Sequence, residues 1–230
     1  PVGLTSSHPM TWFAHYQHRV REIWEQQGPL GILHVVLSGI LRPVLTWKIL
    51  YVYEADIKQW SPPPARQEEF AFKLCSGEEC LEKLRAELCP TGAISVQMVE
   101  TRLKRGDVVA VAHAAGQLAV FSWISFNDQA ARQLEPTLDL QPDEAYQYDA
   151  FVVPRWRGHG LHHLLNSLTG CGARDRGCVR TLSYVDYWNR PSIKTQVRMG
   201  KKKVQTVVSI RFRGRKRPWT KVCGPRTHSR

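Results

Sequence analysis

The residues best suited to chemistry in this chain are two arginines and two glycines that follow the apolar stretch 151–153. In chain order they are Arg155, Arg157, Gly158 and Gly160. Pro154 has no backbone N–H and is expected to end the preceding strand. Leucines then recur at helical spacing from residue 161 onward. A glycine-rich turn that opens onto a helix presents free N–H groups and the positive end of the helix dipole. The loop is therefore predicted to bind a phosphate or pyrophosphate.

Neither the dinucleotide fingerprint G-x-G-x-x-G nor the P-loop pattern G-x-x-x-x-G-K-[ST] stands here. The pattern Arg155-x-x-Gly158-x-Gly160 resembles the acyl-CoA pyrophosphate loop of the GNAT superfamily of N-acetyltransferases, [Q/R]-x-x-G-x-[G/A]. The elements predicted downstream follow a similar order: a strand at 179–185, a helix from Asn189, and a Gly that leads into another strand. The resemblance covers about residues 69–213. A glycine turn without a ligand is the alternative.

The resemblance implies an α/β fold with a mixed, centrally splayed β-sheet flanked by helices. In that fold the pantetheine arm of acyl-CoA lies between the strand before the loop and the next parallel strand. The implied cofactor-binding residues are Val152, Val153, Arg155, Trp156, Arg157, Gly158, His159, Gly160, Leu161, Asn189 and Ser192. Val152 and Val153 would contribute backbone groups, and residues 155–161 would hold the pyrophosphate. Asn189 equally suits a helix N-cap followed by Pro191.

Three residues are predicted to act as acid, base or substrate-orienting group. Family members often carry a Glu just before the apolar segment, where this chain has Tyr148 and Asp149. Asp149 is expected to drain a proton through water and Tyr148 to orient substrate, although each also suits a structural role. The family's frequent acidic Tyr is replaced by Gln196, so Tyr184 is the predicted acid, with Tyr187 nearby. A thiol of pKa ~8.5 also leaves with little assistance.

The predicted activity is transfer of an acetyl or other acyl group from acyl-CoA to an amine acceptor, by direct attack of the amine. The acceptor's identity is not indicated by any motif. Three alternatives stay open: an acyl carrier protein as donor, CoA binding without catalysis, and a membrane-surface protein acting through residues 11–50. No metal is expected, because His159, His162 and His163 have no carboxylate or cysteine close by in sequence to complete a tetrahedral set.

Charge is distributed unevenly along the 230 residues, whose net charge is +12. Residues 1–58 hold 5 basic and 4 acidic side chains, residues 59–150 hold 8 and 14, and residues 151–230 hold 19 and 2. The basic final third suits a polyanion such as CoA, or an acidic partner such as an acyl carrier protein. Residues 211–230 contain no acid and no recognisable nucleic-acid module, so a solvated, partly disordered tail is predicted rather than a nucleic-acid site.

Apolar periodicity and prolines divide the chain into four parts. Residues 1–60 are predicted to be a helical extension plus a strand, 61–68 a linker, 69–213 the acyltransferase domain, and 214–230 a basic tail. The extension holds expected helices at 11–26 and 30–41 and a strand at 48–53. It is predicted to pack on the core or to form a homodimer surface. The domain's front half holds expected strands at 70–74, 107–113 and 118–126 and helices at 77–88 and 94–104.

The sequence also favours a cytoplasmic protein. No apolar run reaches the ~18–20 residues of a membrane span, and no signal peptide is visible. The six cysteines show no C-x-x-C and no zinc spacing, which is typical of free thiols in a reducing compartment. Peripheral membrane association through the N-terminal zone is the alternative.

Overall fold

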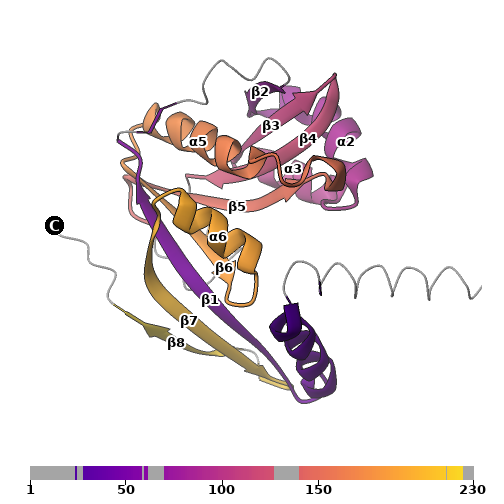
Figure 1. Cartoon of the computed structure of the whole chain (residues 1–230), viewed down its shortest axis with the longest axis vertical. Helices are drawn as coiled ribbons and strands as arrows, with labels where there is room; N and C mark the ends of the chain where they lie inside the picture. Colours follow the sequence, from indigo (N-terminus) through magenta and orange to yellow (C-terminus); the bar gives the residue numbers. More distant parts are fainter. Residues whose placement is uncertain are drawn as a thin grey trace, which may run out of the picture.

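One mixed sheet organises the molecule. The computed structural model describes residues 24, 28–58, 60–61, 70–126, 140–215 and 217–224. Its strands are β1 (Leu45–Asp56), β2 (Phe70–Cys75), β3 (Val108–Ala114), β4 (Gln117–Ser125), β5 (Glu144–Val152), β6 (Arg180–Asp186), β7 (Lys202–Phe212) and β8 (Trp219–Cys223). Within these described residues they form an eight-stranded sheet in the order β2-β3-β4-β5-β6-β1-β7-β8 (Figure 1).

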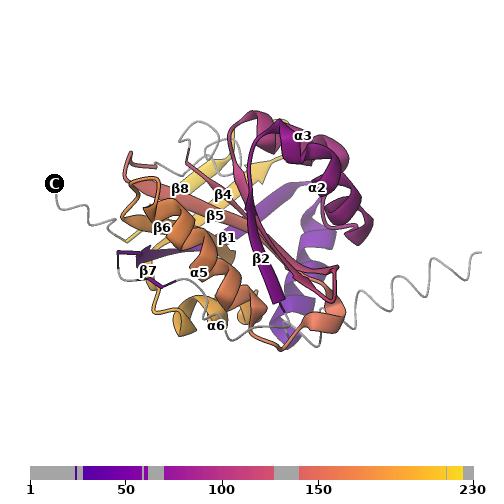
Figure 2. The same ribbon diagram turned by 90° about the horizontal axis from the view of Figure 1, so that it is seen from above.

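Helices cover both faces of this sheet. The labelled helices are α2 (Leu81–Leu88), α3 (Val96–Lys104), α5 (Leu161–Arg174) and α6 (Arg190–Arg198), with short 3₁₀ turns at Glu78–Cys80, Cys89–Thr91 and Pro154–Trp156. Side chains alternate across a strand. Val109 and Val111 of β3 therefore pack with the apolar sides of α2 and α3, whereas Ala110 and Ala112 pack with α5. Figure 2 shows α5 and the α2–α3 pair on opposite faces.

The sheet opens at its centre. β5 and β6 run parallel and pair over residues 144–147 and 180–183. Beyond these residues the two strands diverge, and the rest of β5 has its β6-facing edge unpaired within the described structure. On its other side β5 carries a bulge, because Asp149 and Ala150 together oppose Ser122 of β4. Asp149 has φ 45°, in the left-handed region. The α/β fold with a mixed, splayed sheet is thus confirmed.

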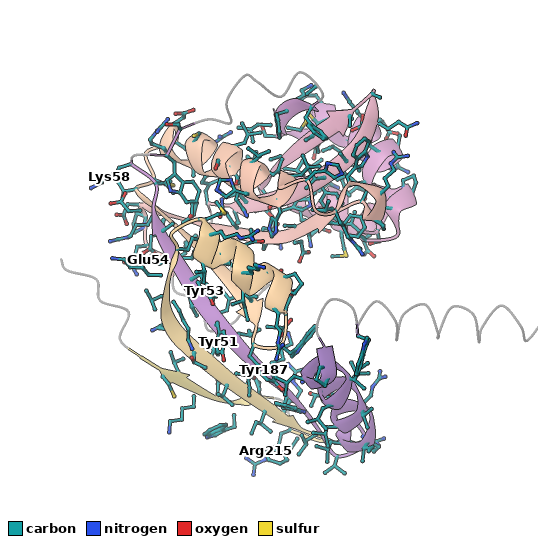
Figure 3. All side chains as sticks on the ribbon, viewed as in Figure 1. Tyr51, Tyr53, Glu54, Lys58, Tyr187 and Arg215 are labelled. Atoms are coloured by element: carbon teal, nitrogen blue, oxygen red, sulfur yellow. The ribbon has the colours of Figure 1, made fainter. Side chains whose placement is uncertain are left out.

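The strand predicted in the N-terminal extension lies inside the sheet. β1 is antiparallel to β6 on one side and to β7 on the other. Figure 3 shows Tyr51 and Tyr53 along it, and the Nζ of Lys203 lies 3.6 Å from the centroid of the Tyr51 ring. Just after β1, Trp60 packs with the core residues beneath α5. Residues 45–58 and 60 therefore belong structurally to the unit that was predicted to span 69–213.

A helix over residues 28–41 precedes β1, close to the helix expected at 30–41. His34 packs its ring against Trp47, Tyr187 and Trp188, with centroids 4.8, 5.8 and 5.3 Å away. Several aliphatic side chains of this helix are exposed: Leu30, Leu33, Val35, Val36, Leu37 and Ile40. A homodimer through this surface stays a prediction. The helix expected at 11–26 lies outside the described residues, apart from helical Trp24.

The other predicted elements differ from the structure mainly at their ends. The helix expected at 77–88 is a 3₁₀ turn followed by α2, and the one at 94–104 is α3, where Ser95 caps by accepting a 3.3 Å bond from the N–H of Met98. The C-terminal segment is not simply a tail: β8 pairs with β7 as the sheet's edge strand. Residues 62–69, 127–139 and 225–230, which include most of the predicted linker, lie outside the described residues. In the part of the chain described, no helix has the length and apolarity to cross a membrane.

Candidate active site

The predicted phosphate loop joins β5 to α5. Gly158 and Gly160 have φ of 88° and 74°, a region that glycine enters without steric cost. Gly160 is the N-cap of α5, and its carbonyl accepts from the N–H groups of His163 and Leu164 at 3.0 and 3.3 Å. The backbone N–H groups that precede those of His163 and Leu164 in the first turn have no acceptor within the helix, as at the start of every α-helix. The loop thus ends in the anion-favouring helix terminus that its sequence predicts.

A groove of about 570 Å³ runs from this loop along β5 to α6. Of the residues predicted to bind the cofactor, eight line it: Val152, Trp156, Arg157, Gly158, Gly160, Leu161, Asn189 and Ser192. Arg198 of α6 adds a further cation. Asn189 is also the N-cap of α6, since its Oδ1 accepts from the N–H of Ser192 at 3.2 Å. The groove therefore brings the loop, the free edge of β5 and the start of α6 together.

Three other predicted residues do not line the groove. Val153 donates its N–H to the carbonyl of Ala119 at 2.9 Å, and its own carbonyl accepts from Trp156 at 2.8 Å. Arg155 donates to Oε1 of Gln117 at 2.5 Å, and His159 packs edge-on against Trp156. Their assignment to the cofactor stays a prediction.

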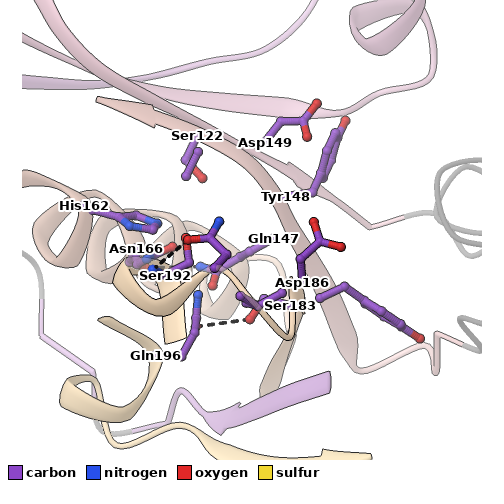
Figure 4. A pocket seen from close by; sticks show the side chains of 14 residues that line it. Ser122, Gln147, Tyr148, Asp149, His162, Asn166, Ser183, Asp186, Ser192 and Gln196 are labelled. Carbon is purple, nitrogen blue, oxygen red and sulfur yellow. Dashed lines mark hydrogen bonds between the residues drawn. The ribbon is translucent and has the colours of Figure 1, made fainter. Parts of the chain in front are cut away.

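A second pocket of about 210 Å³ lies where β5 and β6 separate. Ala150, His162, Asn189 and Ser192 line both this pocket and the groove, so the two cavities meet. The pocket's polar lining comes from five elements, β4, β5, α5, β6 and α6 (Figure 4). The residues that Figure 4 labels are Ser122, Gln147, Tyr148, Asp149, His162, Asn166, Ser183, Asp186, Ser192 and Gln196.

Three polar side chains of the pocket carry groups that can donate hydrogen bonds. Within the described structure, Oγ of Ser122 and Nδ2 of Asn166 are buried without a hydrogen-bond partner, and such groups are uncommon in native proteins. Burial, together with the charges of Lys201 and His163, lowers the pKa of His162 to about 4. His162 is therefore a neutral imidazole at physiological pH.

Two of the predicted catalytic residues are held by the fold. The hydroxyl of Tyr148 donates to Oδ2 of Asp107 at 2.6 Å and accepts from Arg105 at 3.3 Å. Burial, and then the charge of Asp107, raise the pKa of Tyr148, so this phenol stays protonated. The carboxylate of Asp149 forms an ion pair with Arg102, whose guanidinium also lies over the Tyr148 ring. Both residues line the pocket, but their polar groups already have partners.

The third, Tyr184, lines the pocket and packs edge-on against Tyr146, with centroids 5.7 Å apart. Gln196, at the position where the family often has Tyr, is buried and its Oε1 accepts from Ser183 at 3.1 Å. Tyr187 packs against His34 and Trp47 instead. Tyr184 is thus the phenol, of these two, that the structure places at the pocket.

A buried lysine lies beneath the pocket floor. Nζ of Lys201 donates to Oε1 of Gln147 at 2.6 Å and to Oγ of Ser183 at 3.4 Å. Its charge has no ion-pair partner among the described residues, and burial lowers its pKa to about 7. Lys201, Ser122 and Asn166 were not among the residues predicted from the sequence. Lys201 begins a run of three lysines that looks solvated, and Ser122 lies in an apolar strand.

Comparison with known proteins agrees with this architecture. No family model matches the chain. In sequence the chain is 30% identical over 198 residues to a mycothiol acetyltransferase from Thermobifida fusca (strain YX), a match that covers 79% of this chain and 54% of that protein. The chain thus spans about half the length of this relative.

Solved structures of GNAT acetyltransferases share the fold. One, from Colwellia psychrerythraea, superposes with a TM-score of 0.52 at 15% identity over 73% of this chain and 56% of that one. A GCN5-related N-acetyltransferase from Kribbella flavida superposes with a TM-score of 0.51 at 11% identity over 76% and 63%. The structures show the fold, and the loop and the sequence match agree with it. The chain therefore has the GNAT fold.

Proposed function

We propose that this chain is an N-acyltransferase that moves an acetyl or other acyl group from acyl-CoA to a primary amine. The observation that carries the proposal is the continuity of two cavities. A cationic groove at a helix N-terminus leads into a polar pocket at the splay of the sheet. Such a layout separates a phosphate-binding end from a reaction centre, as an acyl-CoA donor requires.

The groove supplies groups suited to each part of the donor. The first turn of α5 and the side chains of Arg157 and Arg198 would bind the pyrophosphate, since helix N-termini and guanidinium groups favour phosphate oxygens. The unpaired edge of β5 at residues 150–152 would hydrogen-bond the amides of pantetheine, as an added strand does.

The pocket supplies donors for the thioester. Ser122, Asn166 and neutral His162 would face the carbonyl oxygen, on which negative charge develops when the amine attacks. Attack forms the C–N bond, and collapse of the intermediate breaks the C–S bond. Tyr184, which lines the same pocket, would then protonate the departing thiolate. The acceptor is proposed as a primary amine.

A matched pair of variants at the loop tests donor binding. Asp and Asn have similar size and both tolerate positive φ better than most residues, and space around the Cβ position of Gly158 is open. Gly158→Asp should lose CoA binding, measured by titration calorimetry, because it puts a negative charge where phosphate would lie. Gly158→Asn should retain more of it. Equal affinity for CoA in wild type and Gly158→Asp would contradict the assignment.

A further inference from the structure

One carboxylate of the pocket forms no hydrogen bond or ion pair with the described residues. Asp186 is the last residue of β6 and lines the pocket. Asp186 and Asp175 are the only two acidic residues after residue 150. Within the described part of the chain, no hydrogen bond or ion pair holds the Asp186 carboxylate. Asp149, the other carboxylate of the pocket, is paired with Arg102.

Strand geometry places Asp186 away from the donor groove. Side chains two residues apart on a strand share a face, so Asp186 lies on the face of Tyr184, and Ser183 lies on the other. Ser183 bonds Gln196 of α6, the helix that lines the groove. Figure 4 shows the pocket between two sides: Tyr148, Asp149 and Asp186 on one, and His162, Asn166 and Ser192 on the other. A donor reaching the pocket from the groove would meet the second side first.

We propose that Asp186 is the catalytic base, which takes the proton of the acceptor's ammonium group; this inference rests on the proposed function. The carboxylate accepts one proton from R–NH₃⁺, which frees the nitrogen lone pair. The neutral amine then forms the C–N bond, and collapse of the intermediate breaks the C–S bond. Tyr184 protonates the thiolate to give the CoA thiol, the second amine proton restores the Tyr184 phenol, and Asp186 returns its proton to water. The site therefore selects a primary amine that is a cation in water.

The surroundings of Asp186 suit this task. Burial raises its pKa, while Lys48 of β1 and His34 of the 28–41 helix oppose that rise. From β5 and β6 the same pocket is faced by the phenols of Tyr148 and Tyr184 and by the paired carboxylate of Asp149. A carboxylate with a raised pKa is a stronger base than an ordinary aspartate, and catalytic groups work best with pKa values near the working pH.

The test compares Asp186→Asn with Asp175→Asn. Asp175 is the C-cap of α5 and is exposed, so its variant should match the wild type. Acetyl-CoA is supplied with spermidine, glucosamine or Nα-blocked lysine, and the best of these is used. At neutral pH the kcat/KM of Asp186→Asn should fall by about 10²–10⁴-fold, the range for loss of a general base. Calorimetry should show unchanged CoA affinity.

The pH profile separates a base from a structural residue. Because Asp186→Asn can use only amine already neutral in solution, its kcat/KM should rise about tenfold per pH unit up to the amine's own pKa. With hydroxylamine as acceptor, which is largely unprotonated at neutral pH, Asp186→Asn should lose far less activity. If Asp186→Asn had the pH profile and the kcat/KM of the wild type, the proposal would be overturned. It would also be overturned if the variant lost CoA affinity together with activity. Failure of the wild type to acetylate any of the amines would overturn the proposed function, and this role with it.

Discussion

At the scale of residues, the site combines a glycine loop that is continuous in sequence with pocket side chains that come from separate elements. The roles of Gly158 and Gly160 could be predicted from the sequence, because a left-handed turn before a helix depends on local residues. Ser122, Asn166 and Asp186 come from β4, α5 and β6, and only the fold brings them together. The partners of Tyr148 and Asp149 are similarly remote, since Asp107 and Arg102 lie 41 and 47 residues earlier, respectively.

Lys201 should make the folding stability depend on pH. In the folded state its pKa is lowered to about 7, whereas an unfolded lysine has a pKa of ~10.4. Between these values the unfolded chain binds a proton that the folded chain does not. The free energy of unfolding should therefore rise with pH by roughly 1.4 kcal/mol per unit from this group, and the rise should vanish below about pH 7.

Lys201→Met should remove that slope, as urea titrations at several pH values would show. It should also stabilise the fold near neutral pH, although Gln147 and Ser183 lose a donor. Lys202→Met, at the exposed neighbouring position, is the control and should keep the wild-type slope. If Lys201→Met retains the full slope, the buried amine is not its source.

Tyr184→Phe should lower kcat by the ~10²–10⁴-fold typical of a lost general acid, with CoA affinity intact. The ring remains, so its packing against Tyr146 is kept and the change is chemical. Tyr187→Phe is the matched control, since Tyr187 packs with Trp47 and His34. Single-turnover measurements with the best amine substrate would compare the rate of acyl transfer in the two variants and the wild type. An unchanged kcat in Tyr184→Phe would mean that the thiolate leaves unassisted.

At the scale of elements, the strands and helices could largely be predicted, but their order in the sheet could not. The β-branched and aromatic residues of 48–53 indicated a strand. Its place between β6 and β7 depends on pairing with residues more than a hundred positions later. β8 was missed because its alternation is interrupted by charge, and because an edge strand can leave such side chains in water.

The contact between the segment after β1 and α5 gives a test at this scale. A Cβ added at Gly170 would lie 2.2 Å from the Trp60 ring, so Gly170→Ala should destabilise the fold by about 1–3 kcal/mol, as overpacking does. Gly172→Ala is the control. Its Cβ would meet the flexible ends of two side chains, Leu74 at 2.7 Å and Arg176 at 3.8 Å. Alanine also favours a helix over glycine by up to ~1 kcal/mol.

Thermal denaturation of both variants would measure the difference. The double variant Gly170→Ala with Trp60→Leu should recover part of the loss, because the smaller side chain removes the clash. Equal stability of Gly170→Ala and the wild type would show that Trp60 is not packed on α5.

At the scale of the whole molecule, the basic and acidic parts of the sequence occupy different parts of the sheet. The strongly basic final third forms α5, α6 and the β6, β7 and β8 strands, and the acidic middle third forms α2, α3 and the β2 to β5 side of the sheet. The charge pattern could be read from sequence, but its separation across the sheet required the topology. Such a surface suits either the phosphates of CoA or an acidic carrier protein.

Ionic strength should distinguish these two donors. We expect acetyl-CoA to be the better substrate, with kcat/KM changing only moderately with salt, because the loop binds phosphate at short range. A carrier protein would dock through many exposed charge pairs, which salt screens within about 8–10 Å.

The charge reversals Arg211→Glu and Lys221→Glu lie on β7 and β8, away from the groove, and should leave acetyl-CoA kinetics unchanged. Steady-state assays at several salt concentrations would compare both donors. Faster turnover with an acylated carrier protein, lost on charge reversal and at high salt, would make the carrier protein the donor.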